Sequence, residues 1–200
     1  MNRTARGAAA LVLAALVVFA GVAVTSVDFA AMESQTEARS TVAASATNGS
    51  GAALDDTLSL YVAEEGPFAD AVADALVAAF AAEGVTATRV DSLAGLDGPV
   101  LAVAVPDYGF DYTPWSSEGA ATVRFVYSSV GNTTAFEAHL AGENGVVGDE
   151  SNPYVMLGDV SLTDRSTGLM SLPAYDRHVT AATADETVTR FLAEARASPR

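Results

Sequence analysis

The feature that most constrains this chain is a run of uncharged residues near its N-terminus. No charged residue occurs from position 7 to position 27. A helix over residues 8–27 would be about 30 Å long, which matches the hydrocarbon core of a lipid bilayer. Arg3 and Arg6 precede the run and Asp28 follows it. By the positive-inside rule, this arrangement predicts a single-pass anchor with its N-terminus in the cytoplasm and the remainder of the chain outside.

A cleaved signal peptide is one alternative for this segment. Signal peptides carry an apolar region of about 7–15 residues followed by a small-x-small cleavage site. Val24-Thr25-Ser26 offers a tolerable site, but the apolar run is longer than usual. The length favours an anchor that stays in the chain.

A second alternative concerns Arg6 and Gly7. This pair, followed directly by an uncharged helix, resembles the N-terminus of archaeal prepilins and archaellins. The resemblance is confined to the N-terminal segment, and it implies cleavage after Gly7 and packing of the helix into a filament core. The acidic residue often found a few positions into pilin helices is missing here. A pilin-like or secretion-system accessory subunit therefore stays open as an interpretation.

Beyond the uncharged run the chain is strongly acidic. From Asp28 onwards eight arginines stand against 25 carboxylates, with no lysine, which gives this part a formal charge of −17. Self-repulsion of such a surface destabilises the folded state in dilute buffer, but at about 1 M salt the Debye length falls to roughly 3 Å and the repulsion is screened. The composition looks like that of a halophile's protein, and the alternative is an acidic surface domain of a mesophile. Nucleic acid is not expected as a partner, because phosphate binding depends on clustered Lys and Arg.

The pattern of the outer part predicts an α/β fold. Leu58, Leu60 and Val62 alternate as in a half-buried strand, and Pro67 then opens a helix with apolar residues every fourth position. A strand at Val85–Val90 follows, so the unit most simply gives a parallel pair. Further strands are expected at 99–105, 121–128 and 154–163, and further helices after the capping boxes Thr134-x-x-Glu137 and Thr183-x-x-Glu186.

These segments predict a simple organisation. We expect one small α/β domain with a mixed sheet of about five strands and two to three helices. The expected parts are a cytoplasmic N-terminus (1–7), a transmembrane or signal-anchor helix (8–27), a helical extension and flexible linker (28–56) and the extracellular domain (57–197).

The most unusual stretch of the domain is an expected loop that runs from Pro106 to Trp115. It follows the most apolar predicted strand, and in open α/β sheets ligands bind beyond the carboxyl ends of strands. Aromatic anchors beside carboxylates suit a protein partner or a sugar ring. The alternative is a lid of aromatic side chains over one end of the core. The residues of this candidate surface are Asp107, Tyr108, Phe110, Asp111, Tyr112 and Trp115.

Signatures of catalysis and of cofactor binding are weak or absent. His178 follows Asp176 closely enough to suggest an oriented base, yet no GxSxG or HExxH motif is present. Two carboxylates in the first strand-to-helix turn, Glu64 and Glu65, would repel a nucleotide phosphate. Cysteine is absent, which excludes disulfides and thiolate metal sites. We therefore expect no cofactor, no metal and no nucleotide.

Two sequons for N-glycosylation, at Asn48 and Asn132, lie on the predicted outer side. The leading interpretation is thus a membrane-anchored, outward-facing acidic domain that works without enzymatic chemistry, as a binding or assembly module for other envelope or surface proteins. The alternatives are the pilin-like or secretion-system subunit and an extracellular hydrolase that uses Asp107, Asp111 and His178.

Overall fold

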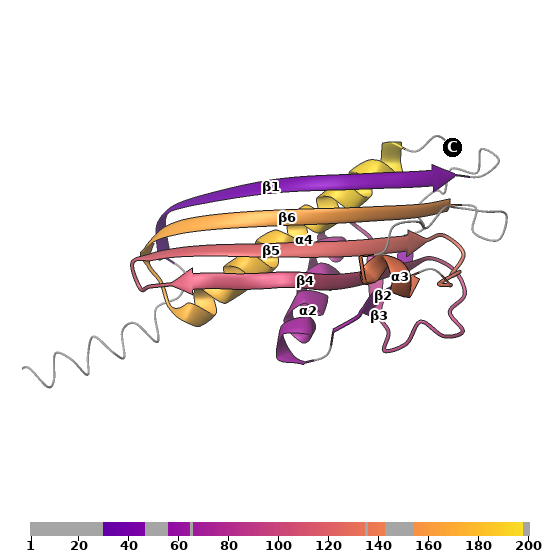
Figure 1. The fold of residues 1–200 in the computed structure, drawn as a ribbon, viewed down its shortest axis with the longest axis horizontal. Helices are drawn as coiled ribbons and strands as arrows, with labels where there is room; N and C mark the ends of the chain where they lie inside the picture. The colour runs from indigo at the N-terminus through magenta and orange to yellow at the C-terminus, as the bar shows by residue number, and fades with distance from the viewer. Residues whose placement is uncertain (1–29, 47–55, 65, 135, 143–153, 198–200) are drawn as a thin grey trace, which may run out of the picture.

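The computed structural model describes residues 30–46, 56–64, 66–134, 136–142 and 154–197. Within these ranges the chain forms one mixed sheet of six strands together with three helices (Figure 1). The predicted mixed α/β fold is confirmed, with six strands in place of about five. None of the helices in these ranges is long and apolar enough to cross a membrane. The predicted anchor at residues 8–27 lies outside them.

The sheet combines a parallel part and an antiparallel part. β2 pairs in parallel with β3 and β4, whereas β4, β5, β6 and β1 are antiparallel neighbours, in the order β1-β6-β5-β4-β2-β3. The predicted parallel pair is therefore confirmed as β2 and β3. The strands are β1 (Ala30–Ala46), β2 (Thr57–Val62), β3 (Thr86–Arg89), β4 (Val100–Tyr112), β5 (Ser116–Ser128) and β6 (Tyr154–Leu169).

The helix between the parallel strands forms where the sequence predicts it. α2 spans Pro67–Ala82 and begins with proline in its first turn, where the missing N–H costs no hydrogen bond. Its buried side includes Val72, Leu76 and Phe80. Gly84 follows the helix with a φ of 80°, a left-handed conformation that glycine adopts without a steric penalty. The chain then turns directly into β3.

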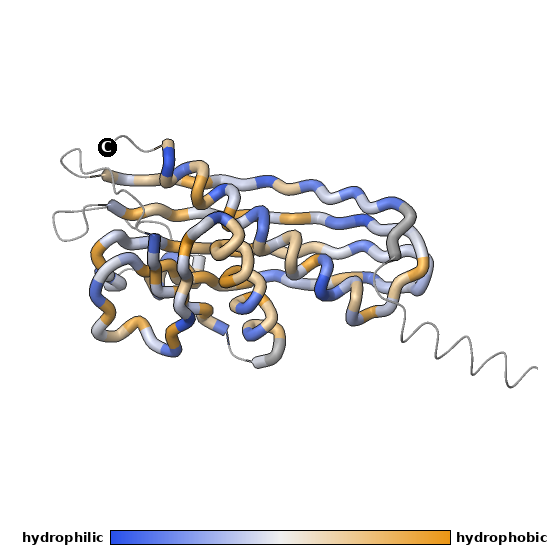
Figure 2. Tube along the Cα trace, turned by 180° about the vertical axis from the view of Figure 1, so that it is seen from behind, coloured by the Kyte–Doolittle hydropathy of each residue, from blue (hydrophilic) through white to orange (hydrophobic). Residues whose placement is uncertain are grey.

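One face of the sheet carries α2 and α4 (Leu172–Ala197), and we call it the helix face. Both helices lie across the strands when the molecule is seen from behind (Figure 2). Phe191 of α4 packs edge-on against Phe80 of α2 and Phe125 of β5, with ring centroids 5.6 and 6.0 Å apart. These three fully buried rings join both helices to the sheet and form the centre of the core.

Among the described residues, the second face of the sheet is covered only at one end. There α3 (Phe136–Leu140) places Phe136 against Val100 and Val126 in a separate apolar cluster. The remainder of this face, formed by β1, β6, β5 and the second half of β4, presents exposed polar side chains such as those of Glu118 and Thr163. We call it the open face.

The expected helical extension and linker at residues 28–56 is wrong for Ala30–Ala46, which forms strand β1. β1 runs antiparallel to β6 from Ala30 opposite Leu169 to Ala46 opposite Tyr154. Backbone hydrogen bonds hold this strand in place with little side-chain burial, since only Ala38, Val42 and Ser45 between Glu33 and Ala46 are even half-buried. The folded unit therefore includes a segment on the N-terminal side of Thr57.

The last helix also begins earlier than the capping box predicts. α4 starts at Leu172, and its first turn is closed by Ser171, whose Oγ accepts from the backbone N–H of Ala174 at 3.3 Å. Thr183 lies inside the helix and is buried. Its hydroxyl donates to the carbonyl of Val179, one turn earlier, at 2.7 Å. The helix has 26 residues, so it extends for about 39 Å along the sheet.

Candidate partner-binding surface

The stretch expected to form a loop after the buried strand is a continuation of that strand. β4 extends to Tyr112, pairs with β5 with one irregularity between Ala104 and Asp107, and turns back through residues 113–115. Thr113 closes this turn, because its Oγ1 donates to the carbonyl of Ser116 at 2.6 Å. The candidate residues therefore alternate between the two faces of the sheet instead of gathering in a loop.

Three aromatic residues of the stretch, Tyr108, Phe110 and Tyr112, lie on the helix face and are half-buried. The ring of Tyr108 lies 4.1 Å from that of Phe68 on α2, and the ring of Phe110 packs edge-on to Tyr175 of α4 at 6.0 Å. Tyr112 donates its hydroxyl hydrogen to the carbonyl of Met170 at 2.7 Å. These rings connect the end of β4 to both helices, which agrees in part with the lid alternative.

The hydroxyl of Tyr108 donates to the carboxylate of Asp176 on α4. Burial, and after it the hydrogen bond to Asp176, raise the pKa of Tyr108 above its ordinary value, so the phenol stays protonated at physiological pH. This bond fixes the ring at the junction of α2, β4 and α4.

An apolar groove of about 480 Å³ lies at this junction. Leu172 is 42 % exposed at its edge and Ala71 is exposed on α2, so the groove opens to solvent. Its polar lining is limited to the carboxylate of Asp176 and the hydroxyl of Tyr108, which bind each other. The groove is lined by Phe68, Ala71, Tyr108, Phe110, Leu172, Pro173 and Asp176. Within the described ranges it joins two predicted site residues, Tyr108 and Phe110, to residues that the sequence did not single out.

The other candidate residues lie elsewhere. Asp107 and Asp111 are exposed on the open face, opposite Thr122 and Glu118 of β5. Trp115 is 67 % exposed in the turn between β4 and β5. Asn132 is half-buried, and its Oδ1 accepts from the hydroxyl of Thr134 at 2.8 Å. Asn48 lies outside the described residues.

His178 does not meet the carboxylates proposed for a hydrolase. It projects from α4 on the helix face, whereas Asp107 and Asp111 project from the open face. Its Nε2 lies 3.2 Å from Oδ1 of Asp164 and 3.3 Å from Oγ of Ser34. A catalytic triad requires the carboxylate and the hydroxyl on different ring nitrogens, and here one nitrogen contacts both. The geometry thus differs from that of a triad.

Asp164 is the centre of a buried cluster that the sequence did not reveal. This residue is fully buried in β6, and its Oδ1 accepts from the hydroxyls of Thr36 at 2.7 Å and Ser34 at 3.1 Å. Its Oδ2 accepts from Ser166 at 2.9 Å. Together with His178, these bonds join β1, β6 and α4. The cluster is a structural junction between elements.

The pKa of Asp164 reflects two opposed effects. Burial alone would raise it, but hydrogen bonds from Thr36, Ser166 and His178 stabilise the ionised form. Their sum outweighs burial and holds the pKa of Asp164 below its ordinary value. The carboxylate is therefore ionised at neutral pH inside the protein.

The end of β2, where nucleotide-binding folds receive phosphate, is occupied by a carboxylate. Glu64 accepts a hydrogen bond at Oε1 from the backbone N–H of Val105 at 2.9 Å. Its Oε2 is buried and has no hydrogen-bond partner among the residues that the structure describes. A negative group at this position disfavours an anionic ligand. Within the described residues, no group of three or more His, Asp or Glu side chains is arranged to hold a metal ion.

No protein-family model and no curated protein matches this chain. Among solved structures, it is similar to a variant of PelC from Paraburkholderia phytofirmans, which is a dodecamer. That similarity has 17% identity and a TM-score of 0.36, and it covers 75% of this chain and 95% of PelC. A minor lipoprotein from Acinetobacter baumannii is similar at 13% identity with a TM-score of 0.32, over 68% of this chain and 88% of the lipoprotein. Both similarities are low and concern only the course of the backbone.

Proposed function

We propose that this chain is a membrane-anchored, outward-facing domain of a salt-adapted cell, which binds another envelope or surface protein without enzymatic chemistry. The observation that supports this proposal is the open apolar groove between α2, β4 and α4, floored by Tyr108 and Phe110. Grooves with apolar walls and few polar groups are the usual sites at which proteins receive apolar side chains.

The solvent of a halophile gives this groove a particular importance. At about 1 M salt a Debye length of roughly 3 Å leaves surface charges little reach, so charge alone does not recruit a partner. Burial of apolar surface remains effective, and a buried Leu or Phe side chain contributes about 1.5–3 kcal/mol. The partner surface that fits is one with exposed apolar side chains, because the groove is lined by apolar groups apart from Asp176 and Tyr108, which bind each other.

The test is to fill the groove with a side chain, in the full-length protein in its native membrane at about 1 M salt. A photo-reactive residue at Leu172 captures the partner, and Ala71→Arg places a long charged side chain into the groove. Ala81→Arg is the matched control, since Ala81 is exposed on α2 but does not line the groove. We expect Ala71→Arg to reduce capture by about tenfold or more and Ala81→Arg to leave it unchanged.

Equal capture in wild type and Ala71→Arg would show that the groove does not hold the partner. Capture that is lost in both variants would indicate a general effect of the added arginine, and it would likewise count against the groove.

A further inference from the structure

The free edge of β1 is the longest unpaired backbone edge in the described part of the chain. β1 has 17 residues and stands at one end of the sheet, whereas β3 at the other end has four. Edge strands are usually kept from pairing with other chains by proline, bulges, charges or short length. β1 contains no proline, and its one irregularity lies at its start, between Ala31 and Glu33. Such an edge is a template for another strand.

The side chains of β1 leave its backbone accessible. Ala, Ser and Thr account for most of the strand, and most of its side chains between Glu33 and Ala46 are exposed. Three charged residues interrupt this pattern, namely Glu33, Glu37 and Arg39. They lie on the open face, because the alternate residues Ser34 and Thr36 contact Asp164 on the helix face.

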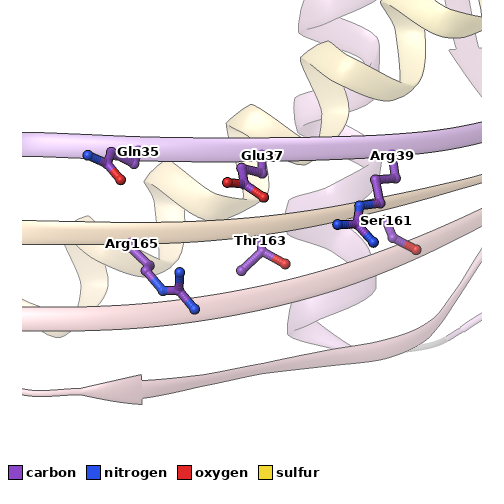
Figure 3. Close-up of a pocket in the computed structure, with 6 residues that line it drawn as sticks. All are labelled: Gln35, Glu37, Arg39, Ser161, Thr163 and Arg165. Atoms are coloured by element: carbon purple, nitrogen blue, oxygen red, sulfur yellow. The ribbon is translucent and has the colours of Figure 1, made fainter.

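Arg39 is unusual in so acidic a protein, because among the described residues it has no carboxylate within ion-pair distance. By contrast, Arg89, Arg124, Arg165, Arg190 and Arg196 each have one. Arg39 and Glu37 project from β1 toward the same side and border a hollow of about 320 Å³ on the open face (Figure 3). An unpaired cation and an anion two residues apart on an edge strand form a self-complementary pattern.

We propose that β1 pairs with β1 of a second copy of this chain, antiparallel about a two-fold axis at Ala38, so that the two six-stranded sheets become continuous. In this register each residue lies opposite the residue equally far on the other side of Ala38. Glu37 of each copy is then opposite Arg39 of the other, which gives two symmetric ion pairs on the open face. This surface goes beyond the groove proposed for the partner protein.

Length and charge select this register among its neighbours. Ala38 is the midpoint of Ala30–Ala46, so the whole strand is paired only when the axis passes through it. An axis at Glu37 or at Arg39 places like charges directly opposite each other, which destabilises a strand pair. An axis at Thr36 pairs Glu33 with Arg39 but leaves the last four residues of β1 without a partner strand.

The absence of cysteine makes the register directly testable in the full-length protein. With the axis at Ala38, the Cα atoms of Ala38 in the two copies are about 4.5–5.5 Å apart, within the range that a disulfide bridges. Ala38→Cys is therefore expected to form a disulfide-linked dimer on oxidation in membranes at about 1 M salt, where repulsion between the acidic copies is screened.

Ala43→Cys is the matched control on the same strand. Its counterpart in the second copy lies ten residues away along the strand, or about 33 Å, so no disulfide is expected. Co-expression of Ala43→Cys with Glu33→Cys is the positive control, and a disulfide is expected because these two positions are opposite each other in the proposed pair.

The ion pairs have their own test, in which dimerisation of the full-length protein in detergent is measured by sedimentation. Arg39→Glu places carboxylates opposite each other and is expected to weaken the dimer on the order of tenfold. The swap Glu37→Arg with Arg39→Glu keeps the net charge of the wild type and restores the opposition of unlike charges, so it should recover the dimer.

Three results would overturn the proposal. The first is equal cross-linking of Ala38→Cys and Ala43→Cys, and the second is capture of a different polypeptide by Ala38→Cys. The third is a charge-swap variant that dimerises as weakly as Arg39→Glu. Circular dichroism of each variant shows whether the fold is retained, and within the described part of the chain Arg39 makes no ion pair that its replacement would break. Failure here leaves the groove untouched, because no residue that lines the groove belongs to β1.

Discussion

Asp164 shows how one residue joins three elements of this fold. A buried carboxylate is costly unless hydrogen bonds compensate for the lost water, and here Ser34, Thr36, Ser166 and His178 do so. Two of these donors come from β1, a strand with little apolar burial. On the helix face, the cluster therefore supplies a large part of the side-chain contact that joins β1 to β6 and α4.

Asp164→Asn is predicted to lower the free energy of unfolding at pH 7 by about 1–3 kcal/mol, because the ionised acceptor is lost. Because the pKa of Asp164 is lowered in the folded protein, the ionised carboxylate stabilises the fold. This stabilisation is fully present above the unfolded pKa of about 3.9 and disappears as the pH falls through the folded pKa. The difference between wild type and variant should therefore shrink in acid. Urea unfolding of the full chain in detergent at both pH values measures this.

Asp111→Asn is the control for that comparison, since Asp111 is exposed on the open face. A difference between wild type and Asp164→Asn that stays constant from neutral to acidic pH would contradict the assignment of an ionised Asp164.

Gly158 in β6 is required by the close packing of Phe125, which lies opposite it on β5. A methyl group at Gly158 would approach ring carbons of Phe125 to 3.0 Å or less, and this ring is fully buried. We expect Gly158→Ala to destabilise the fold by about 1–3 kcal/mol through overpacking. Gly109→Ala, in β4 with open space around it, should change stability by less than about 0.5 kcal/mol. Thermal unfolding of both variants measures these losses of stability. Equal destabilisation by Gly158→Ala and Gly109→Ala would contradict the close packing of Phe125 on Gly158.

Among the elements, the sequence predicted those whose burial follows a regular period. β2 and α2 could be predicted because Leu58, Leu60 and the four-residue spacing of α2 all face one core. The same alternation was present in Asp107–Tyr112 and, in retrospect, indicates a half-exposed strand. That stretch was instead expected to form a loop beyond the most apolar strand. For α4, Ser171 and Pro173 were the start signals that the capping box at Thr183 obscured.

β1 could not be predicted in this way, and the candidate groove only in part. An edge strand is fixed by backbone pairing to β6, and its small polar side chains give no apolar period. Tyr108 and Phe110 were identified from their unusual composition, but Ala71 and Leu172 carry no signal of their own. Their position depends on how α2 and α4 cross β4, which is a tertiary property.

Hydrogen exchange tests β1 as an element. In an antiparallel pair at a sheet edge, about every second residue directs its N–H to the neighbouring strand. We expect slow exchange at alternate amides of Glu33–Ala46 in a monomeric sample and protection of most of them in the proposed dimer. Uniformly fast exchange across these residues would show that the segment behaves as the flexible linker that the sequence suggested.

At the scale of the whole molecule, charge sets the conditions under which the fold persists. Residues from Asp28 onwards carry eight arginines and 25 carboxylates, and most of the ion pairs that arginines make within the described residues are exposed and individually weak. The far-ultraviolet circular dichroism of the full chain is predicted to weaken when salt falls from about 1 M to about 0.1 M, because screening is lost. An unchanged spectrum would contradict salt adaptation.

The most direct test of an outward-facing binding domain is cysteine labelling on intact cells with a membrane-impermeant maleimide. Two variants are compared, Leu172→Cys at the exposed edge of the groove and Ala120→Cys on the exposed open face. We expect rapid labelling of Ala120→Cys and protection of Leu172→Cys by the bound partner, with both labelled equally in the purified protein. Labelling of neither on intact cells would contradict the outward orientation, and equal labelling of both on intact cells would contradict an occupied groove.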